Sequence, residues 1–219
     1  MSEYLVLQQA DGVYRQVAHP GYLDENGNLA AHNLLADRGY YLATDTPPTF
    51  DARYQVATRD PSDQWTFDHT AKTCTVTYTV TQKPNAFADY QLQAHRQIDG
   101  IVDTKLRQGA TVTVNGATHT IQTRNVRDNT NMLSLYSKAT AKEARGDATP
   151  GVLRTQEDVN LELTPSEMIT TLEAVFDTQE GIYQQGWEAK ASVDSITEGT
   201  DIVAALDAVD AAVNAFQTS

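Results

Sequence analysis

Short runs of alternating apolar and polar residues fill the first third of the chain, which is the pattern of half-buried β-strands. Antiparallel strands are predicted at residues 4–8, 13–17, 52–58, 64–68 and 73–81. Asp11-Gly12 between the first two strands favours a tight hairpin turn. A short helix is predicted at 29–37, and Pro47-Pro48 interrupts regular structure. The N-terminal part is therefore expected to be mostly an antiparallel β unit.

The strand predicted at 73–81 has the clearest one-sided pattern. Cys74, Val76, Tyr78 and Val80 share one face, and five threonines share the other. This alternation is typical of a sheet with one buried side. No histidine or basic residue is adjacent to Cys74, so its thiol is interpreted as a small core group and not as a nucleophile.

After residue 89 the apolar period changes to that of a helix. Helices are predicted at 89–108 and at 128–145, and Gly109 is expected to end the first. The inward face predicted for the first helix consists of Leu92, His95, Ile98, then Ile101 or Val102, then Lys105 or Leu106. Met132, Ala139 and either Leu135 or Tyr136 are expected to face inward in the second.

Asn115-Gly116 lies between two alternating runs, which is the strongest short signal of a hairpin. Both central residues of a type I′ turn need a positive φ angle, and Asn and Gly tolerate it best. A two-residue turn pairs Val114 with Ala117 and Val112 with His119, all on one face of the ribbon. We therefore predict a β-hairpin here, with its tip available for contacts to a neighbouring subunit.

Thr164-Pro165-Ser166-Glu167 has the composition of a helix start. Thr164 suits the N-cap position, Pro165 suits the first helical residue, and Glu167 can close a capping box. A half-buried strand is predicted just before it, at residues 159–163. A long amphipathic helix is expected to follow, with an inward face of Met168, Ile169, Leu172, Val175, Phe176, Ile182 and Tyr183.

A second apolar seam lies close to the C-terminus. Its members recur at alternating four- and three-residue steps and are Ile202, Leu206, Val209, Val213 and Phe216. One interpretation is a helix, capped by Thr200, that folds back on the Thr164 helix as an αα-hairpin. The other is an oligomer seam between copies of the chain. The two are compatible if several hairpins meet on one axis.

These patterns predict an α+β protein in which a mostly antiparallel β part precedes a helical part. We expect an N-terminal β-rich domain at 1–83, an α+β domain at 84–199 and a C-terminal amphipathic helix at 200–219. The α+β domain should contain the Asn115-Gly116 hairpin. The C-terminal helix should complete a helical hairpin.

Composition narrows the classes of function. A net charge of −13 argues against a nucleic-acid-binding surface. No run approaches the ~18 apolar residues of a membrane-spanning helix, so membrane insertion is not expected. Met1-Ser2-Glu3 is not followed by an apolar core, so no signal peptide is expected. The single cysteine cannot form an internal disulfide.

No catalytic, cofactor-binding or metal-binding residues are predicted, and we do not expect an enzyme. The five histidines are scattered and none forms a ligand pair four residues apart; they are His19, His32, His69, His95 and His119. Ser134 and Ser166 lack the glycine-flanked setting of a nucleophile elbow, and Ser166 belongs to a helix cap.

The order of elements from Ala94 to Ile196 resembles a C-terminal domain of unknown function found in small tail-fibre and baseplate-associated proteins of tailed bacteriophages. The resemblance rests on the segments AHRQIDGIVDTKLRQG, VTVNGATHTIQT and LTPSE. The Pro-Pro segment, with Asp51 and the following Trp-bearing strand, is similar to the start of short phage tail proteins. In place of the tryptophan usual in that family, the chain has Val152-Leu153-Arg154-Thr155 before the cap.

This resemblance implies a structural component of the virion tail, in the baseplate, tail tip or tail fibre, that is made in the host cytoplasm. Its partners would be other phage tail or baseplate proteins, and a homo-oligomer, preferably a trimer, is expected. Two alternatives remain open. One is a tail-fibre assembly chaperone that is absent from the mature virion, and the other is a carbohydrate-binding adhesin tip for host attachment.

Overall fold

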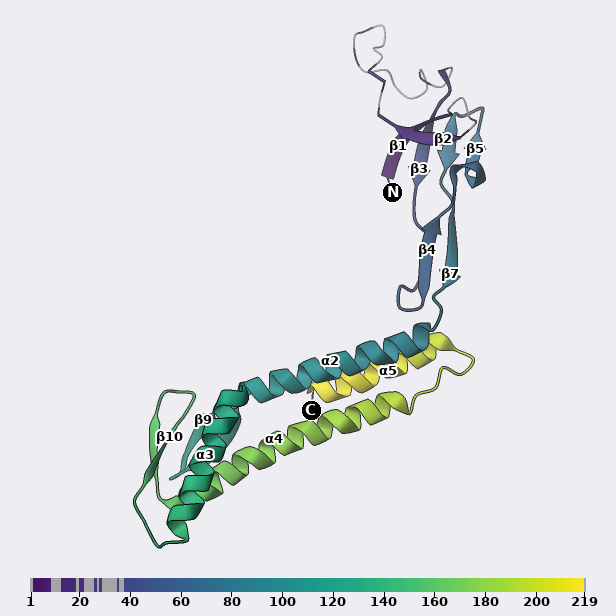
Figure 1. Ribbon diagram of the computed structural model, residues 1–219. Helices are drawn as coiled ribbons and strands as arrows, with labels where there is room; N and C mark the ends of the chain where they lie inside the picture. Colours follow the sequence, from purple (N-terminus) through teal and green to yellow (C-terminus); the bar gives the residue numbers. More distant parts are fainter. Residues whose placement is uncertain are drawn as a thin grey trace. The chain divides into compact units, whose positions relative to one another are not determined.

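The computed structural model describes residues 2–8, 13–18, 20–21, 26, 28, 35 and 38–218 of the 219-residue chain. The chain divides into two compact units, residues 1–86 and 87–219. The first is built mainly of β-strands, and the second of helices with two β-hairpins (Figure 1). The α+β class predicted from the sequence is therefore confirmed.

A five-stranded sheet forms the centre of the first unit. Its strands, in spatial order, are β2 (Tyr14–Val17), β1 (Ser2–Gln8), β3 (Tyr40–Asp45), β6 (Thr73–Thr75) and β5 (Thr66–Asp68). β1 and β2 pair antiparallel, as predicted, with Gln8 opposite Tyr14. The Asp11-Gly12 turn lies outside the described residues, as does the helix predicted at 29–37 except for Leu35.

The prediction of one strand over 73–81 is wrong, because the segment is shared between two sheets. β6 pairs with β3 in parallel, whereas β7 (Tyr78–Gln82) pairs antiparallel with β4 (Gln55–Arg59). A short 3₁₀ helix, η2 (Ser62–Gln64), precedes β5. The expected common face is divided accordingly: Cys74 and Val76 are buried, and Val80 is exposed.

Aromatic and small side chains pack on one side of the five-stranded sheet. The buried members are Val6, Tyr41, Ala43, Cys74 and Val76. Tyr14 stacks on Phe67 with ring centres 3.8 Å apart. Burial raises the pKa of the Cys74 thiol to about 11, which keeps it protonated at neutral pH. The interpretation of Cys74 as a small core residue agrees with this position.

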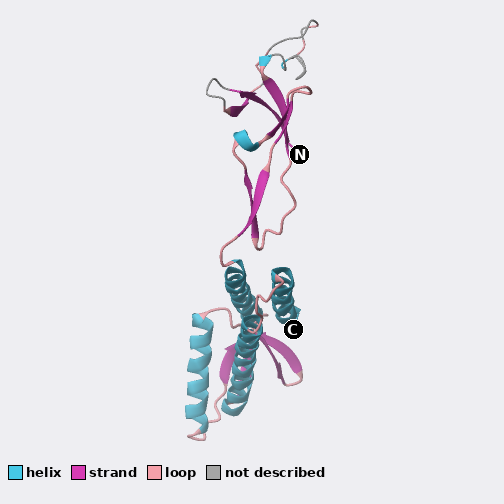
Figure 2. Cartoon of the chain, turned by 90° about the vertical axis from the view of Figure 1, so that its right-hand side faces the viewer, coloured by secondary structure: helices cyan, strands magenta, loops and turns pink. Residues whose placement is uncertain are grey.

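Four long helices and two hairpins make up the second unit (Figure 2). The helices are α2 (Ala86–Gln108), α3 (Val126–Glu143), α4 (Pro165–Asp194) and α5 (Ile202–Thr218). The hairpins are β8 (Ala110–Val114) with β9 (Ala117–Ile121), and β10 (Gly151–Arg154) with β11 (Asn160–Leu163). Among the described residues, no helix combines the length and apolar character needed to span a bilayer.

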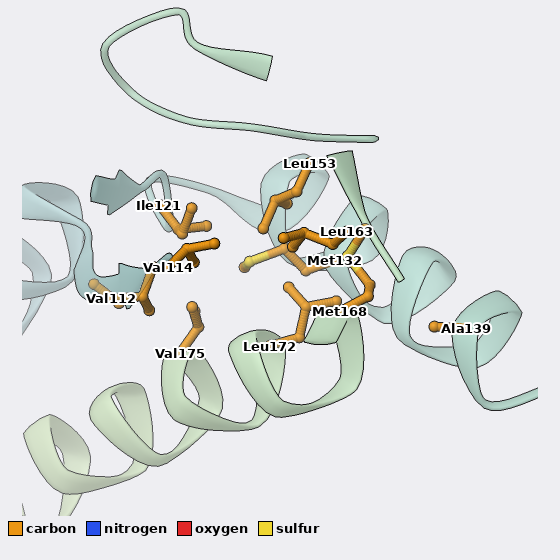
Figure 3. Packing of buried hydrophobic residues seen from close by; sticks show 11 residues of the cluster. Val112, Val114, Ile121, Met132, Ala139, Leu153, Leu163, Met168, Leu172 and Val175 are labelled. Atoms are coloured by element: carbon orange, nitrogen blue, oxygen red, sulfur yellow. The ribbon is translucent and has the colours of Figure 1, made fainter. Parts of the chain in front are cut away.

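One hydrophobic cluster joins both hairpins and α3 to the first half of α4 (Figure 3). Its members are Ala110, Val112, Val114, Ile121, Met132, Ala139, Leu153, Leu163, Met168, Leu172 and Val175. Gly109 is required at the entry to this cluster, since its φ angle is +86° and a Cβ atom there would lie 2.7 Å from the carbonyl oxygen of Ile121.

Helix α2 packs along α4 and α5, and its inward face differs from the predicted one at Leu92. Leu92 is 50% exposed, whereas Ile98, Val102 and Leu106 are buried as predicted. Gln91 lies inward instead and donates hydrogen bonds from Nε2 to the carbonyl oxygens of Val193 and Ile196. These bonds satisfy backbone groups at the C-terminal end of α4, which fixes the rotation of α2.

Candidate interaction surface

The hairpin turn at Asn115-Gly116 has the expected backbone geometry. The φ angles are +51° at Asn115 and +79° at Gly116, as a type I′ turn requires. Val114 lies opposite Ala117, and Val112 lies opposite His119. The turn itself is exposed.

Replacing Gly116 with valine should therefore destabilise the protein by roughly 1–3 kcal/mol, because a β-branched residue is strained at positive φ. Urea unfolding of the full chain measures the effect. The control is Ala117→Val at the neighbouring exposed strand position, which should change stability by less than about 0.5 kcal/mol. Equal stability of the Gly116→Val variant and the parent chain would contradict the turn type.

The start of α4 is closed by a complete capping box. The Thr164 hydroxyl accepts a hydrogen bond from the Glu167 backbone N–H at 3.4 Å. The Glu167 carboxylate in turn accepts hydrogen bonds from the Thr164 hydroxyl at 2.7 Å and the Thr164 N–H at 2.9 Å. These bonds lower the pKa of Glu167 below its ordinary value of 4.5.

The stabilising effect of Glu167 should depend on pH. Its folded-state pKa is depressed, so the contribution is fully present above pH 4.5 and is lost as the pH falls through the lowered pKa. Glu167→Gln should therefore cost stability at neutral pH and progressively less in acid. Urea unfolding of both chains from neutral pH down to about pH 3 measures this difference. A difference that stays constant over the whole range would exclude the ionised cap.

The structure brings the predicted turn and the predicted cap together. Asn115 at the hairpin tip and Glu167 in the first turn of α4 line the same hollow of about 230 Å³. Ser166, Thr170 and Thr171 complete its α4 side. The hydrogen bonds of Thr164 and Glu167 are already explained by capping, so both residues hold the start of α4 in place.

The side chains of the C-terminal seam pack inside the single chain. Leu206, Val209, Val213 and Phe216 are buried within the single chain, and Ile202 is half-buried. Lys105 of α2 places Nζ 5.1 Å from the centre of the Phe216 ring. Side chains of α2 and α4 in the same chain cover the seam, as the αα-hairpin interpretation expects, and a contact between copies of the chain stays a prediction. The helix is capped by Asp201, not by Thr200: the Asp201 carboxylate accepts hydrogen bonds from the N–H groups of Val203 and Ala204.

An exposed aromatic pair on α4 is not apparent from the sequence pattern. Tyr183 and Trp187 lie one helical turn apart, with ring centres 6.4 Å apart and an interplanar angle of 27°. Their exposed fractions are 43% and 62%. The sequence pattern puts Tyr183 on the buried face, because an apolar period does not distinguish a residue at the edge of a face from one at its centre.

A hollow of about 380 Å³ between α2 and α4 adjoins the aromatic pair. Besides Tyr183 and Trp187 it is lined by Asp99, Val102, Asp103, Gly186 and Lys190. We call these seven residues the Trp187 surface. Lys190 Nζ lies 2.5 Å from Asp99 Oδ1, so its charge is neutralised within the chain. The hollow therefore combines exposed aromatic rings with a carboxylate.

Gly186 permits the close approach of α2 to α4 beneath this surface. A Cβ atom at residue 186 would lie 2.6 Å from Cγ2 of Val102. Real Cβ atoms do not approach other atoms so closely, so a side chain here would push the helices apart. The glycine thus determines the spacing of the two helices that carry the surface.

The surroundings of the Trp187 surface are strongly acidic. The helices around it, residues 86–108 and 165–219, together contain thirteen acidic and four basic side chains. Asp103 lies in the hollow, and Glu180 lies one helical turn before Tyr183. Within the described part of the chain, neither of these two carboxylates forms an ion pair or a hydrogen bond. Their negative charge is therefore available to an external group.

Within the described residues, no group of three or more His, Cys, Asp or Glu side chains is arranged to hold a metal ion. His95 of α2 is near a single carboxylate, with Nε2 2.9 Å from Oδ1 of Asp194. This contact joins α2 to the C-terminal end of α4.

Residues 89–213 match the family described as Domain of unknown function (DUF4376). The match spans more than half of the chain, so the chain belongs to this family. No curated protein and no solved structure matches the chain.

Proposed function

We propose that this chain is a structural component of a tailed-phage virion, in the baseplate, tail tip or tail fibre, and that it acts by binding other tail proteins. The observation that carries the proposal is the Trp187 surface. Trp and Tyr are the residues most enriched among those that dominate protein–protein binding energy, and here both are exposed side by side. The resemblance of the segments between Ala94 and Ile196 to small phage tail proteins supports the same assignment.

The geometry of the site suits assembly better than catalysis. The aromatic pair lies on a 30-residue helix held on one side by α2 and at its start by the capping box. A rigid helical surface of this kind loses little conformational entropy when a partner binds. We infer that the function is non-catalytic and resides in protein–protein contacts.

A carbohydrate-binding adhesin is the second candidate. The same rings could stack on a sugar while Asp103 accepts hydrogen bonds from its hydroxyl groups. Binding of a neutral oligosaccharide to the Trp187 surface would support this candidate over the structural one.

Self-association into a trimer is part of the proposal and rests on the phage resemblance alone. The contact must use surfaces other than the buried side of α5. One exposed candidate in the first unit is the β4–β7 ribbon, which carries exposed Val56 and Val80. Light scattering of the full chain should give a mass of three copies. A monomer at all concentrations would exclude the trimer.

Mass spectrometry of purified particles tests the proposed function. A structural component should be present in a fixed ratio to the other tail proteins. A chain that is abundant in infected cells but absent from purified particles would instead indicate the assembly chaperone.

A further inference from the structure

We propose that the Trp187 surface binds a positively charged side chain of a partner protein, with an arginine lying against the Trp187 and Tyr183 rings. This inference rests on the proposed function and specifies the partner's chemistry at that site. The occupant is a segment of another protein that carries exposed arginine residues.

The exposed aromatic rings suit a guanidinium group. A guanidinium group is attracted to the face of an indole ring, and arginine makes this contact more often than lysine. The chain already contains such a pair, because the guanidinium carbon of Arg59 lies 4.5 Å from the centre of the Trp65 ring. Trp187 has no such cation over its face among the described residues, and it is the more exposed member of its pair.

Two carboxylates close to the rings can bind the charge of an arginine. Asp103 in the hollow and Glu180, one turn of α4 before Tyr183, form no ion pair within the described residues. Both are exposed, so a partner can reach them without displacing an internal contact. A planar guanidinium donates several N–H groups and can contact a ring face and a carboxylate together.

Charge complementarity selects among possible occupants. A second copy docking face to face through this surface would bring together two acidic faces, each built from helices with thirteen acidic and four basic side chains over residues 86–108 and 165–219. Like charges opposed across an interface are unfavourable. A neutral saccharide gains nothing from the excess of negative charge. A cationic protein segment is attracted both by the aromatic rings and by the negative potential around them.

Fluorescence of Trp187 provides a direct test, since the chain has only two tryptophans. In the full chain with Trp65→Phe, Trp187 is the sole reporter. The probe is a short peptide of alternating arginine and glycine, and the comparison ligands are the corresponding glutamate peptide and a neutral glucose oligosaccharide. We expect a saturable change with the arginine peptide that weakens as salt increases, and no change with the other two.

Paired variants show whether binding is local. Asp103→Asn combined with Glu180→Gln should weaken binding of the arginine peptide by about tenfold. The matched control, Glu143→Gln combined with Glu198→Gln, removes the same charge elsewhere in the unit and should change binding by less than about twofold. If Trp65→Phe impairs folding, calorimetry can replace fluorescence. It compares the affinity of the arginine peptide for the chain with both tryptophans and for its Trp187→Ala variant.

Four results would overturn the inference. They are the absence of a saturable response to the arginine peptide, an equal loss of binding in the control pair, a response to the oligosaccharide but not to the peptide, and a Trp187 signal that depends on protein concentration without ligand. None of them bears on whether the chain is present in purified particles. Only the response to the oligosaccharide also favours the adhesin candidate, and the other three results leave the proposed function, which the particle measurement tests, unaffected.

Discussion

Leu206→Ala should lower the free energy of unfolding by about 2–5 kcal/mol, and the loss should not depend on protein concentration. Leu206 is 0% exposed and belongs to the face of α5 that packs within the chain. Truncating it leaves a cavity among side chains that cannot fully close around it. Urea unfolding at several protein concentrations measures both the size of the loss and its concentration dependence.

The matched control is Leu92→Ala, the same substitution at an exposed position of α2. It should change stability by less than about 0.5 kcal/mol. If the stability of the parent chain rises with concentration and Leu206→Ala abolishes that rise, the C-terminal seam lies between copies of the chain. The intramolecular packing of α5 would then be wrong.

Gly186→Leu should destabilise the second unit by about 1–3 kcal/mol through overpacking. The reason is that a Cβ atom at residue 186 would come within 2.6 Å of Val102 Cγ2, which leaves no space for a side chain between α2 and α4. Because the substitution also moves the two helices that carry the Trp187 surface, it should weaken binding of the arginine peptide as well.

Gly181→Leu on the same helix is the control with the opposite sign. No atom lies within 4 Å of a Cβ position at Gly181, so leucine there meets open space. Leucine is a better helix former than glycine, and the variant should gain about 0.5–1 kcal/mol. Thermal unfolding of both variants checks the pair. A stabilised Gly186→Leu variant would contradict the close packing of α2 against α4.

The elements predicted well from sequence are those determined by local backbone chemistry. Asn115-Gly116 adopts positive φ at both residues because few other residue pairs tolerate that geometry. Thr164 and Glu167 close a capping box because their spacing alone brings the two side chains together. These signals need no knowledge of the rest of the fold.

The errors arise where distant parts of the chain decide the outcome. The segment 73–81 has one continuous alternating pattern, yet β6 pairs with β3 and β7 pairs with β4. Strand alternation shows which residues share a face, not which strand lies alongside. The rotation of α2 likewise depends on its hydrogen bonds to the end of α4, so the sequence pattern puts Leu92 on the wrong side.

The exposure of Trp187 could not have been predicted from the sequence. Its position four residues after Tyr183 suits a buried apolar face equally well. Only the packing of α2 against Gly186 shows that this face ends before the two rings. The candidate surface can therefore be recognised only from the tertiary structure. The capping box of α4 and the Asn115-Gly116 turn, in contrast, can be recognised in the sequence.

The central claim is that the chain is a tail component held in the particle through the Trp187 surface. The most direct test is quantitative mass spectrometry of particles assembled with either the parent chain or its Trp187→Ala variant. The account predicts a fixed copy number of the parent chain per particle and a strongly reduced copy number of the variant, with equal amounts of both folded in the cell. Absence of the parent chain from purified particles, or equal incorporation of the two chains, would contradict it.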